Sequence, residues 1–138
     1  MHVDGGCHCG NITYEAEIDE GKVVICHCED CQRMSGAPYN AVAMVTESNF
    51  TLKTGALAEY VKTAESGNKR SQMFCSNCAT RIYATAAETP PDGAEKIFGV
   101  RVGTINQRAE LKPGRQAWHR SAQPWVNNLA DIPAIETQ

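Results

Sequence analysis

Apolar and polar residues alternate along much of the chain, and this period of two predicts short β-strands. Ile12, Tyr14, Ala16 and Ile18 alternate with polar neighbours, as they would in a strand with one buried face. Runs of the same kind predict further strands at residues 22–25, 41–45, 57–62, 71–74, 81–85 and 96–102. Residues that favour turns, mainly Gly, Asn, Ser and Pro, separate the runs. The pattern therefore predicts a mainly β fold of antiparallel strands with little helix.

The segments between the strands carry weaker signals. Residues 29–35 follow a group of cysteines and are the longest stretch that can form a helix, while residues 88–95 are expected to form an exposed loop. The segment 123–138 is expected to pack back on the body as an irregular tail, because it contains Trp125, Leu129, Ile132 and Ile135. No repeat or linker interrupts the chain, so residues 1–138 are expected to form a single domain.

Composition narrows the function classes. The chain has 138 residues, of which 42% are hydrophobic and 21% are charged, and its formal net charge is −3. These values exclude a disordered, collagen-like or coiled-coil chain, and the acidic balance argues against a nucleic-acid partner. The N-terminal residues do not resemble a signal peptide, and no apolar run is long enough to span a bilayer. We therefore expect a cytoplasmic protein without a membrane partner.

Cysteines are the most informative residues in the sequence. There are seven, and they fall into three groups, Cys7-x-Cys9, Cys26-x-Cys28-x-x-Cys31 and Cys75-x-x-Cys78. In a reducing cytosol, clustered cysteines usually bind metal or take part in catalysis. Disulfides are the rival interpretation, but they would leave one thiol unpaired. The grouping therefore favours metal binding.

The spacing of the cysteines suggests how they divide between sites. Two pairs can complete the four-ligand shell of a structural zinc, and glycines around Cys7 and Cys9 permit the turn that a C-x-C pair needs. The simplest division joins Cys7 and Cys9 to Cys75 and Cys78 and leaves Cys26, Cys28 and Cys31 together. An alternative joins Cys26 and Cys28 to the last pair, but it leaves Cys31 and the first pair without partners.

The three remaining cysteines predict a metal with an open fourth position, as in catalytic zinc sites. An incoming thiol could bind there and lose its proton. The alternative is a second closed site in which a distant histidine, His119 or His2, supplies the fourth ligand. His8 and His27 are poorer candidates, because each lies between two cysteines and would point away.

Other residues give less specific signals. Arg33, Lys53, Arg81 and Arg101 could bind the carboxylates of a small acidic substrate or could simply be solvated. The aromatic residues Tyr39, Trp118 and Trp125 could line a pocket, but aromatic side chains of a small β domain usually lie in the core. Ala79 follows the last cysteine pair, where zinc knuckles often have glycine, and it would be strained if that position requires a positive φ.

Several motifs together resemble one family. They are Gly6-Cys7-His8-Cys9-Gly10, the segment CHCEDCQRMSG at 26–36, FCSNC at 74–78, VGT at 102–104, and PW and ADIP at 124–125 and 130–133. In this order they are similar to the motifs of the glutathione-dependent formaldehyde-activating enzymes, a family that includes centromere protein V. Ala79 departs from the family pattern, which has glycine there.

The resemblance implies a fold and a site. The fold would consist of coiled antiparallel β-sheets around zinc, called a β-tent, with two zinc ions per chain. Cys7, Cys9, Cys75 and Cys78 would bind a structural zinc, and Cys26, Cys28 and Cys31 would bind a second, functional zinc. The activity implied is that of S-(hydroxymethyl)glutathione synthase, a carbon–sulfur lyase, with glutathione as co-substrate.

Two hypotheses about function follow. In the first, the protein is a zinc-dependent lyase-type enzyme that activates a small thiol, glutathione, for addition to formaldehyde or another small aldehyde. Its general base cannot be identified from the sequence, and His27 and His119 are guesses. In the second, it is a non-catalytic zinc-binding module for protein interaction or metal carriage, with an exposed apolar patch. A redox switch at a C-x-x-C pair is a third, weaker reading.

Overall fold

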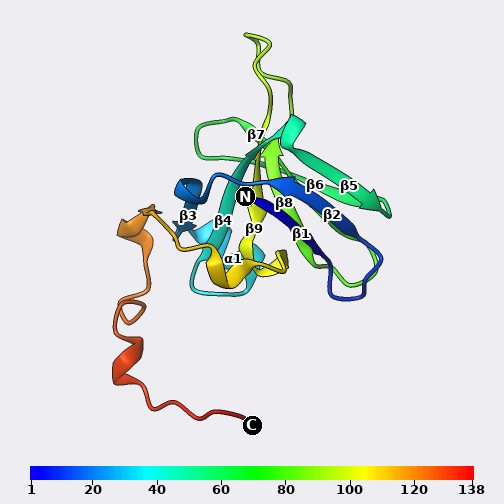
Figure 1. The fold of residues 1–138 in the computed structure, drawn as a ribbon. Coiled ribbons are helices and arrows are strands. Elements are labelled where there is room, and N and C mark those ends of the chain that lie inside the picture. The colour runs from blue at the N-terminus through cyan, green and yellow to red at the C-terminus, as the bar shows by residue number, and fades with distance from the viewer.

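Two β-sheets of unequal size pack face to face (Figure 1). The structure is a computed structural model that describes all of residues 1–138. The smaller sheet has the order β1 (His2–Gly6), β2 (Thr13–Glu17), β5 (Phe50–Thr54). The larger has the order β10 (Arg115–Ala117), β3 (Val23–Cys26), β4 (Asn40–Thr46), β9 (Ile97–Arg101), β8 (Arg81–Ala86), β7 (Lys69–Cys75), β6 (Leu57–Thr63).

Helix is confined to short pieces. The one α-helix is α1 (Glu29–Ser35), which coincides with the segment predicted. The 3₁₀ turns are η1 (Glu20–Lys22), η2 (Glu47–Asn49), η3 (Val102–Thr104), η4 (Arg108–Glu110), η5 (His119–Ser121) and η6 (Leu129–Asp131). No helix has the length and apolar character needed to cross a membrane. The prediction of a mainly β fold with little helix is confirmed.

The strand predictions are confirmed for β2, β3, β4, β6, β7, β8 and β9, and three strands were not predicted. These are β1, β5 and β10. The predicted antiparallel pairing holds throughout both sheets except at one edge, where β10 pairs with β3 in parallel and Ala117 lies opposite Cys26. This edge pairing brings the segment after β10 close to the Cys26 group.

The core lies between the two sheets. Alternation along the strands turns Val23, Ala43, Val45 and Val100 of the large sheet inward, where they form one cluster with Val3, Tyr14 and Ala16 of the small sheet. The Tyr14 hydroxyl is buried and meets Thr104 Oγ1 at 2.7 Å, and Thr104 in turn donates to the Arg101 carbonyl. Burial raises the pKa of Tyr14 to about 12, so the phenol remains a neutral donor.

Alternation also turns a second set of side chains to the opposite face of the large sheet. Val42 and Met44 of β4 lie there with Cys26, and α1 packs beside them, so that Cys31 and Met34 line a cavity with these three residues. This outer face is free of the second sheet. A ligand can therefore reach this face from solvent.

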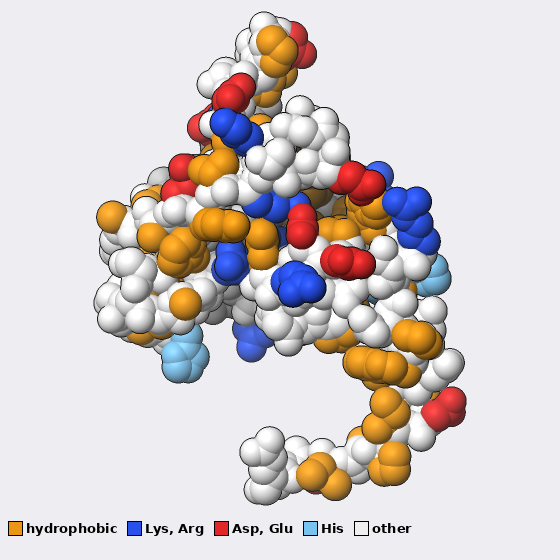
Figure 2. Space-filling view, turned by 180° about the vertical axis from the view of Figure 1, so that it is seen from behind, with side chains coloured by type: hydrophobic (Ala, Val, Ile, Leu, Met, Phe, Trp, Pro, Cys, Tyr) orange, Lys and Arg blue, Asp and Glu red, His pale blue; other side chains and the backbone are white.

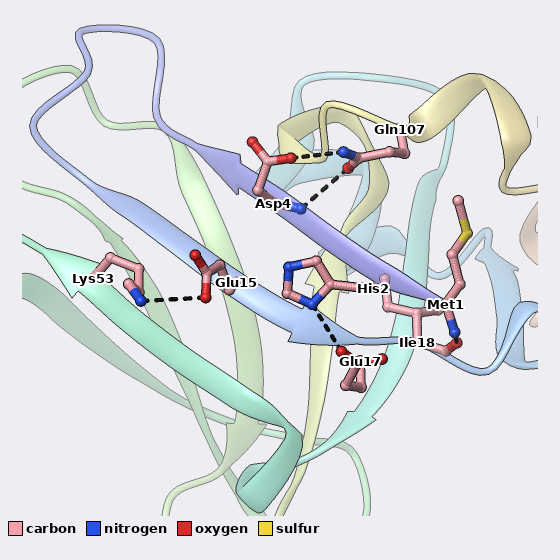
Figure 3. A network of polar contacts seen from close by, with 8 residues as sticks. All are labelled: Met1, His2, Asp4, Glu15, Glu17, Ile18, Lys53 and Gln107. Atoms are coloured by element: carbon pink, nitrogen blue, oxygen red, sulfur yellow. Dashed lines mark hydrogen bonds and ion pairs between the residues drawn. The ribbon is translucent and has the colours of Figure 1, made fainter.

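Polar contacts hold the exposed side of the small sheet (Figure 3). Lys53 of β5 pairs with Glu15 of β2 at 3.2 Å, and His2 of β1 lies 2.7 Å from Glu17. The N-terminal ammonium of Met1 donates to the Ile18 carbonyl. The side chains of the two charged pairs are about half exposed, so each pair contributes little to stability.

The C-terminal tail differs from its prediction. Residues after η5 run away from the body (Figure 1), and in Figure 2 their apolar side chains stand clear of it. Trp125 is 47% exposed and Ile135 is 80% exposed, and Leu129 and Ile132 are also exposed. Only Val126 of this segment is buried. The expectation that residues 123–138 pack back is wrong, because the core is already closed by the two sheets. The loop at 88–95 is exposed, as predicted.

Gly5 offers a test of how closely β1 approaches the core. A Cβ at this position would lie 2.4 Å from the Thr104 carbonyl oxygen and 2.5 Å from Tyr14 Oη. Because a backbone carbonyl and a packed ring cannot move freely, Gly5→Ala should lower the free energy of unfolding by about 1–3 kcal/mol. Gly103→Ala is the control, since nothing lies within 4 Å of the added carbon. Urea unfolding of both variants measures the difference, and equal stabilities would contradict this packing.

Candidate metal centres

Four cysteines meet between the two sheets. Cys7 and Cys9 belong to the β1–β2 connection, Cys75 ends β7, and Cys78 lies in the turn to β8. Their Sγ atoms all lie within 4.8 Å of one another, with 3.5 Å between Cys7 and Cys9 and 3.8 Å between Cys9 and Cys75. Sulfurs on a tetrahedral zinc with bonds of about 2.3 Å are about 3.8 Å apart. The four thiols of this first cluster therefore fit such an ion.

Hydrogen bonds prepare the first cluster for metal. The Ile12 backbone N–H donates to Cys7 Sγ at 3.2 Å. Thr80 Oγ1 accepts from the His8 backbone N–H and lies 3.2 Å from Cys78 Sγ. The Thr80 hydroxyl, followed by backbone N–H groups of Thr80 and Cys9, lowers the pKa of Cys78 to about 5. These donors favour the thiolate, which is the form that binds metal.

Three further cysteines form the second cluster, on the outer face of the large sheet. Cys26 ends β3, Cys28 precedes α1, and Cys31 lies in the first turn of α1. Their sulfurs also lie within 4.8 Å of one another. Cys28 Sγ accepts the Cys31 backbone N–H as the helix cap, so the start of α1 and the placement of the thiols depend on each other. A hydrogen bond between the Cys26 and Cys31 thiols lowers the pKa of Cys26 to about 5 and raises that of Cys31.

The end of α1 and its side chains hold the second cluster in place. Gly36 ends the helix with φ of 65° and donates to the Gln32 carbonyl. The Gln32 side-chain amide donates to the carbonyls of His27 and Ser121, and it accepts from Gln123. These bonds tie α1 to β3 on one side and to the chain after β10 on the other.

The histidines do not join either cluster. His27 is 1% exposed, its Nε2 lies 2.6 Å from Gln116 Oε1, and its ring packs edge-on against His119 and Tyr39. The His8 backbone N–H donates to Thr80 Oγ1, and the His2 side chain pairs with Glu17. Both groups of side chains that lie close enough together to bind one metal ion consist of cysteines alone. The structure thus brings together the four and the three cysteines of the simplest division, and it places neither His119 nor His2 as a fourth ligand.

The second cluster opens on two adjoining cavities. Cys26 and Cys31 line a cavity of about 260 Å³, and Cys28 lines one of about 440 Å³. The two share Asp30 and Lys62, which form an ion pair between α1 and β6. Figure 2 shows basic side chains gathered with apolar ones in the middle of the body. A ligand that enters from solvent can therefore reach the three thiols.

Trp118 stands at the rim of the larger cavity. It has a left-handed backbone with φ of 54°, is 46% exposed, and lies 4.9 Å from the Arg120 guanidinium carbon. Trp125 is exposed on the tail, and Tyr39 is half-buried beside α1. Neither tryptophan belongs to the core, because both follow β10 and are about half exposed, and Trp118 instead lines a cavity, the other role that the sequence allowed.

The predicted cationic residues separate into two groups. Arg81 and Arg101 line one pocket near the second cluster, whereas Lys53 pairs with Glu15 on the other sheet and Arg33 is exposed on α1. Sequence reasoning missed Asn40, Lys62, Arg70 and Gln72. Arg70 and Gln72 alternate along β7, which indicates one shared face, but alternation alone does not say which sheet neighbour they meet.

Comparison with known proteins agrees with this geometry. The sequence profile of a family described as glutathione-dependent formaldehyde-activating enzyme matches residues 2–121. The chain belongs to this family. The match covers all seven cysteines and ends at η5, so the exposed tail lies outside it.

Two relatives extend the comparison. A Schizosaccharomyces pombe protein named as an uncharacterized lyase is 30% identical over 80 residues, which are 58% of this chain and 55% of that protein. The chain thus matches only about half the length of this curated relative. A crystal structure of a Rhodobacter sphaeroides protein has a TM-score of 0.58 at 21% identity, and the likeness covers 83% of this chain and 99% of that one. This second likeness concerns the fold alone.

Ala79 provides a test of strain beside the first cluster. Its φ is 61°, so the position does require the positive φ at which alanine is strained. A left-handed conformation costs alanine ~1–2 kcal/mol, whereas glycine adds ~0.4–1 kcal/mol of unfolded-chain entropy. Ala79→Gly should therefore raise the free energy of unfolding by about 0.5–1 kcal/mol. Ala94→Gly, in the exposed loop, is the control and should not stabilise the protein. Denaturant unfolding of the metal-loaded protein measures the change in the free energy of unfolding. An Ala79→Gly variant less stable than the wild-type protein would show that Ala79 is not strained.

Proposed function

We propose that this chain is a zinc-dependent enzyme of the carbon–sulfur lyase type, with residues 1–138 acting as one domain in a reducing cytoplasm. Cys7, Cys9, Cys75 and Cys78 would hold a structural zinc, and the second cluster would hold a functional zinc. The observation that carries the proposal is the second cluster itself. It has three thiols, no fourth protein ligand, and cavities that open beside it.

The residues around the second cluster suit a thiol substrate. A zinc ion bound by three thiolates would supply Lewis acidity and would lower the pKa of an incoming thiol. Cys28 is oriented by the Cys31 backbone N–H, and Lys62 and Arg101 place positive charge beside the cavity. Met34, Val42 and Met44 make part of the cavity apolar, which limits water near the thiols.

The proposed reaction is the addition of a thiol to an aldehyde, glutathione to formaldehyde in the family's named activity. The thiol sulfur forms a bond to the carbonyl carbon, the carbonyl π electrons move to oxygen, and the thiol proton ends on that oxygen. The sum is an addition that needs no oxidant or reductant. His27 is buried, and neither His27 nor His119 lines either cavity, so we assign the role of general base to neither residue.

A second candidate function is a non-catalytic zinc-binding module for protein interaction or metal carriage. The observation that favours it is the exposed apolar tail, with Trp125, Leu129, Ile132 and Ile135 in solvent. The tail lies outside the family match, so both functions can belong to one chain.

Metal content separates the roles of the two clusters. Native mass spectrometry of the purified protein should show two zinc ions per chain. Cys31→Ser should lose one ion and remain folded, because the second cluster lies on the outer face of the large sheet. Cys75→Ser should unfold or lose most of its stability, because Cys75 is 2% exposed within the core and metal binding there is coupled to folding. One ion in the wild-type protein, or unfolding of Cys31→Ser, would argue against this assignment.

Catalysis can be measured directly. Glutathione and formaldehyde interconvert with S-(hydroxymethyl)glutathione at equilibrium. The protein should accelerate this interconversion, and NMR exchange spectroscopy measures its rate. Cys31→Ser should abolish the acceleration, because two thiols no longer hold the functional ion. Arg33→Gln, which changes an exposed residue of the same helix that lines none of these cavities, is the matched control. Absence of acceleration by zinc-loaded wild-type protein would favour the non-catalytic module.

A further inference from the structure

Three residues that line one pocket each carry a buried N–H group without a hydrogen-bond partner. In the whole chain, four buried side-chain polar atoms have no hydrogen-bond partner: His27 Nδ1, Asn40 Nδ2, Arg81 Nη1 and Arg101 Nε. The last three belong to residues that line a single pocket of about 360 Å³. We name this space the Arg81–Arg101 pocket. Because buried donors without partners are costly, their gathering in one place indicates a ligand that accepts hydrogen bonds.

The sheet register holds these donors in place. Asn40 is the first residue of β4, Arg81 the first of β8 and Arg101 the last of β9, so all three lie near one end of the large sheet. Asn40 is 7% exposed. Arg101 Nη2 donates to Gln72 Oε1 at 2.9 Å, and the Arg81 guanidinium lies over the Phe74 ring. Both arginines are thus oriented by neighbours that leave other N–H groups free.

The charge around the pocket is not balanced by the chain. The four ion pairs of the protein use His2, Lys22, Lys53 and Lys62, and none of them involves an arginine. Arg70 and Arg81 each lie close enough to Arg101 to repel it, whereas Cys26 and Cys31, as thiolates, attract it. A divalent ion with three thiolates has a net charge of about −1, which offsets only one of three guanidinium groups. The remaining positive charge suits an anion.

The pocket adjoins the second cluster. Arg101 and Met34 line both the Arg81–Arg101 pocket and the cavity that contains Cys26 and Cys31. A molecule with its sulfur at the three thiols can therefore extend past Arg101 into the pocket. Planar guanidinium groups bind carboxylates through paired hydrogen bonds, and an amide N–H adds a third donor.

We propose that the Arg81–Arg101 pocket binds a carboxylate of the thiol substrate, so that Asn40, Arg81 and Arg101 select acidic thiols over neutral ones. This inference rests on the proposed function, because it assigns the sulfur of the same molecule to the second cluster. It names specificity-determining residues that touch the substrate away from the reacting sulfur.

The first test uses the unmodified, zinc-loaded protein. Isothermal titration calorimetry compares glutathione with its diethyl ester, in which both carboxylates are blocked but the thiol is intact. The ester should bind about ten- to a hundredfold more weakly, as expected when charge-assisted hydrogen bonds are lost. Equal affinities would overturn the proposal, and this result does not depend on the folding of any variant.

The second test changes the pocket. Arg81→Gln and Arg101→Gln should each weaken glutathione binding about tenfold or more, and Arg101→Lys should restore part of the loss because it keeps the charge without the planar fork. Arg33→Gln is the matched control, because Arg33 is exposed on α1 and lines neither space. For the diethyl ester, all four variants should match the wild-type protein. A glutathione affinity that is unchanged in both Arg81→Gln and Arg101→Gln would overturn the proposal.

A third ligand distinguishes this proposal from the proposed function. S-methylglutathione keeps both carboxylates but cannot form a thiolate. If glutathione binds more tightly than S-methylglutathione, yet neither depends on Arg81 or Arg101, the cluster receives the thiol and the carboxylate assignment is wrong. If the two bind equally and both weaken in the arginine variants, the pocket binds carboxylates and the thiol role of the cluster is wrong. Acetate serves as the free-anion probe: arginine-dependent affinity for acetate equal to that for glutathione would overturn the assignment to a thiol substrate.

Discussion

The rest of the structure depends on the meeting of four thiols between the two sheets. Cys7 is buried on the side of the small sheet and Cys75 on the side of the large one, so the first cluster joins both layers at the edge of the core. A three-stranded sheet buries too little apolar surface to be stable alone. Metal bound by these thiols would add a link between the layers that apolar packing alone does not provide. The Thr80 hydroxyl and backbone N–H groups nearby favour the thiolates that such a link requires.

Burial of one face of the large sheet leaves its other face for chemistry. The alternation that sends Val23 and Val45 into the core sends Cys26 and Arg101 to the outer side. The helix α1 adds Cys31 above this surface, and its start is capped by Cys28. Scaffold and site therefore share strands but not faces, which allows the site to contain unpaired charge without disturbing the core.

The sequence predicts those features that depend on local pattern. Strands with clear alternation and cysteines two or three positions apart are local signals, and the division into four and three cysteines follows from them. The strand β1 escaped prediction because two of its five residues are glycine, and β10 because three residues make too short a pattern. Nothing local joins Asn40, Arg81 and Arg101, whose proximity depends on the order of strands in the sheet. The apolar content of residues 123–138 predicts that they pack against the body. Composition alone does not show whether the folded body leaves an apolar surface for them to cover.

The two clusters also differ in the time at which each can form during folding. The second cluster spans residues 26–31, a loop so short that its ends meet on a timescale below about a microsecond even in an unfolded chain. The first cluster joins Cys9 to Cys75 across most of the strands and can close only after the two sheets have docked. Metal supplied to the nascent chain would therefore meet the three thiols of the second cluster first.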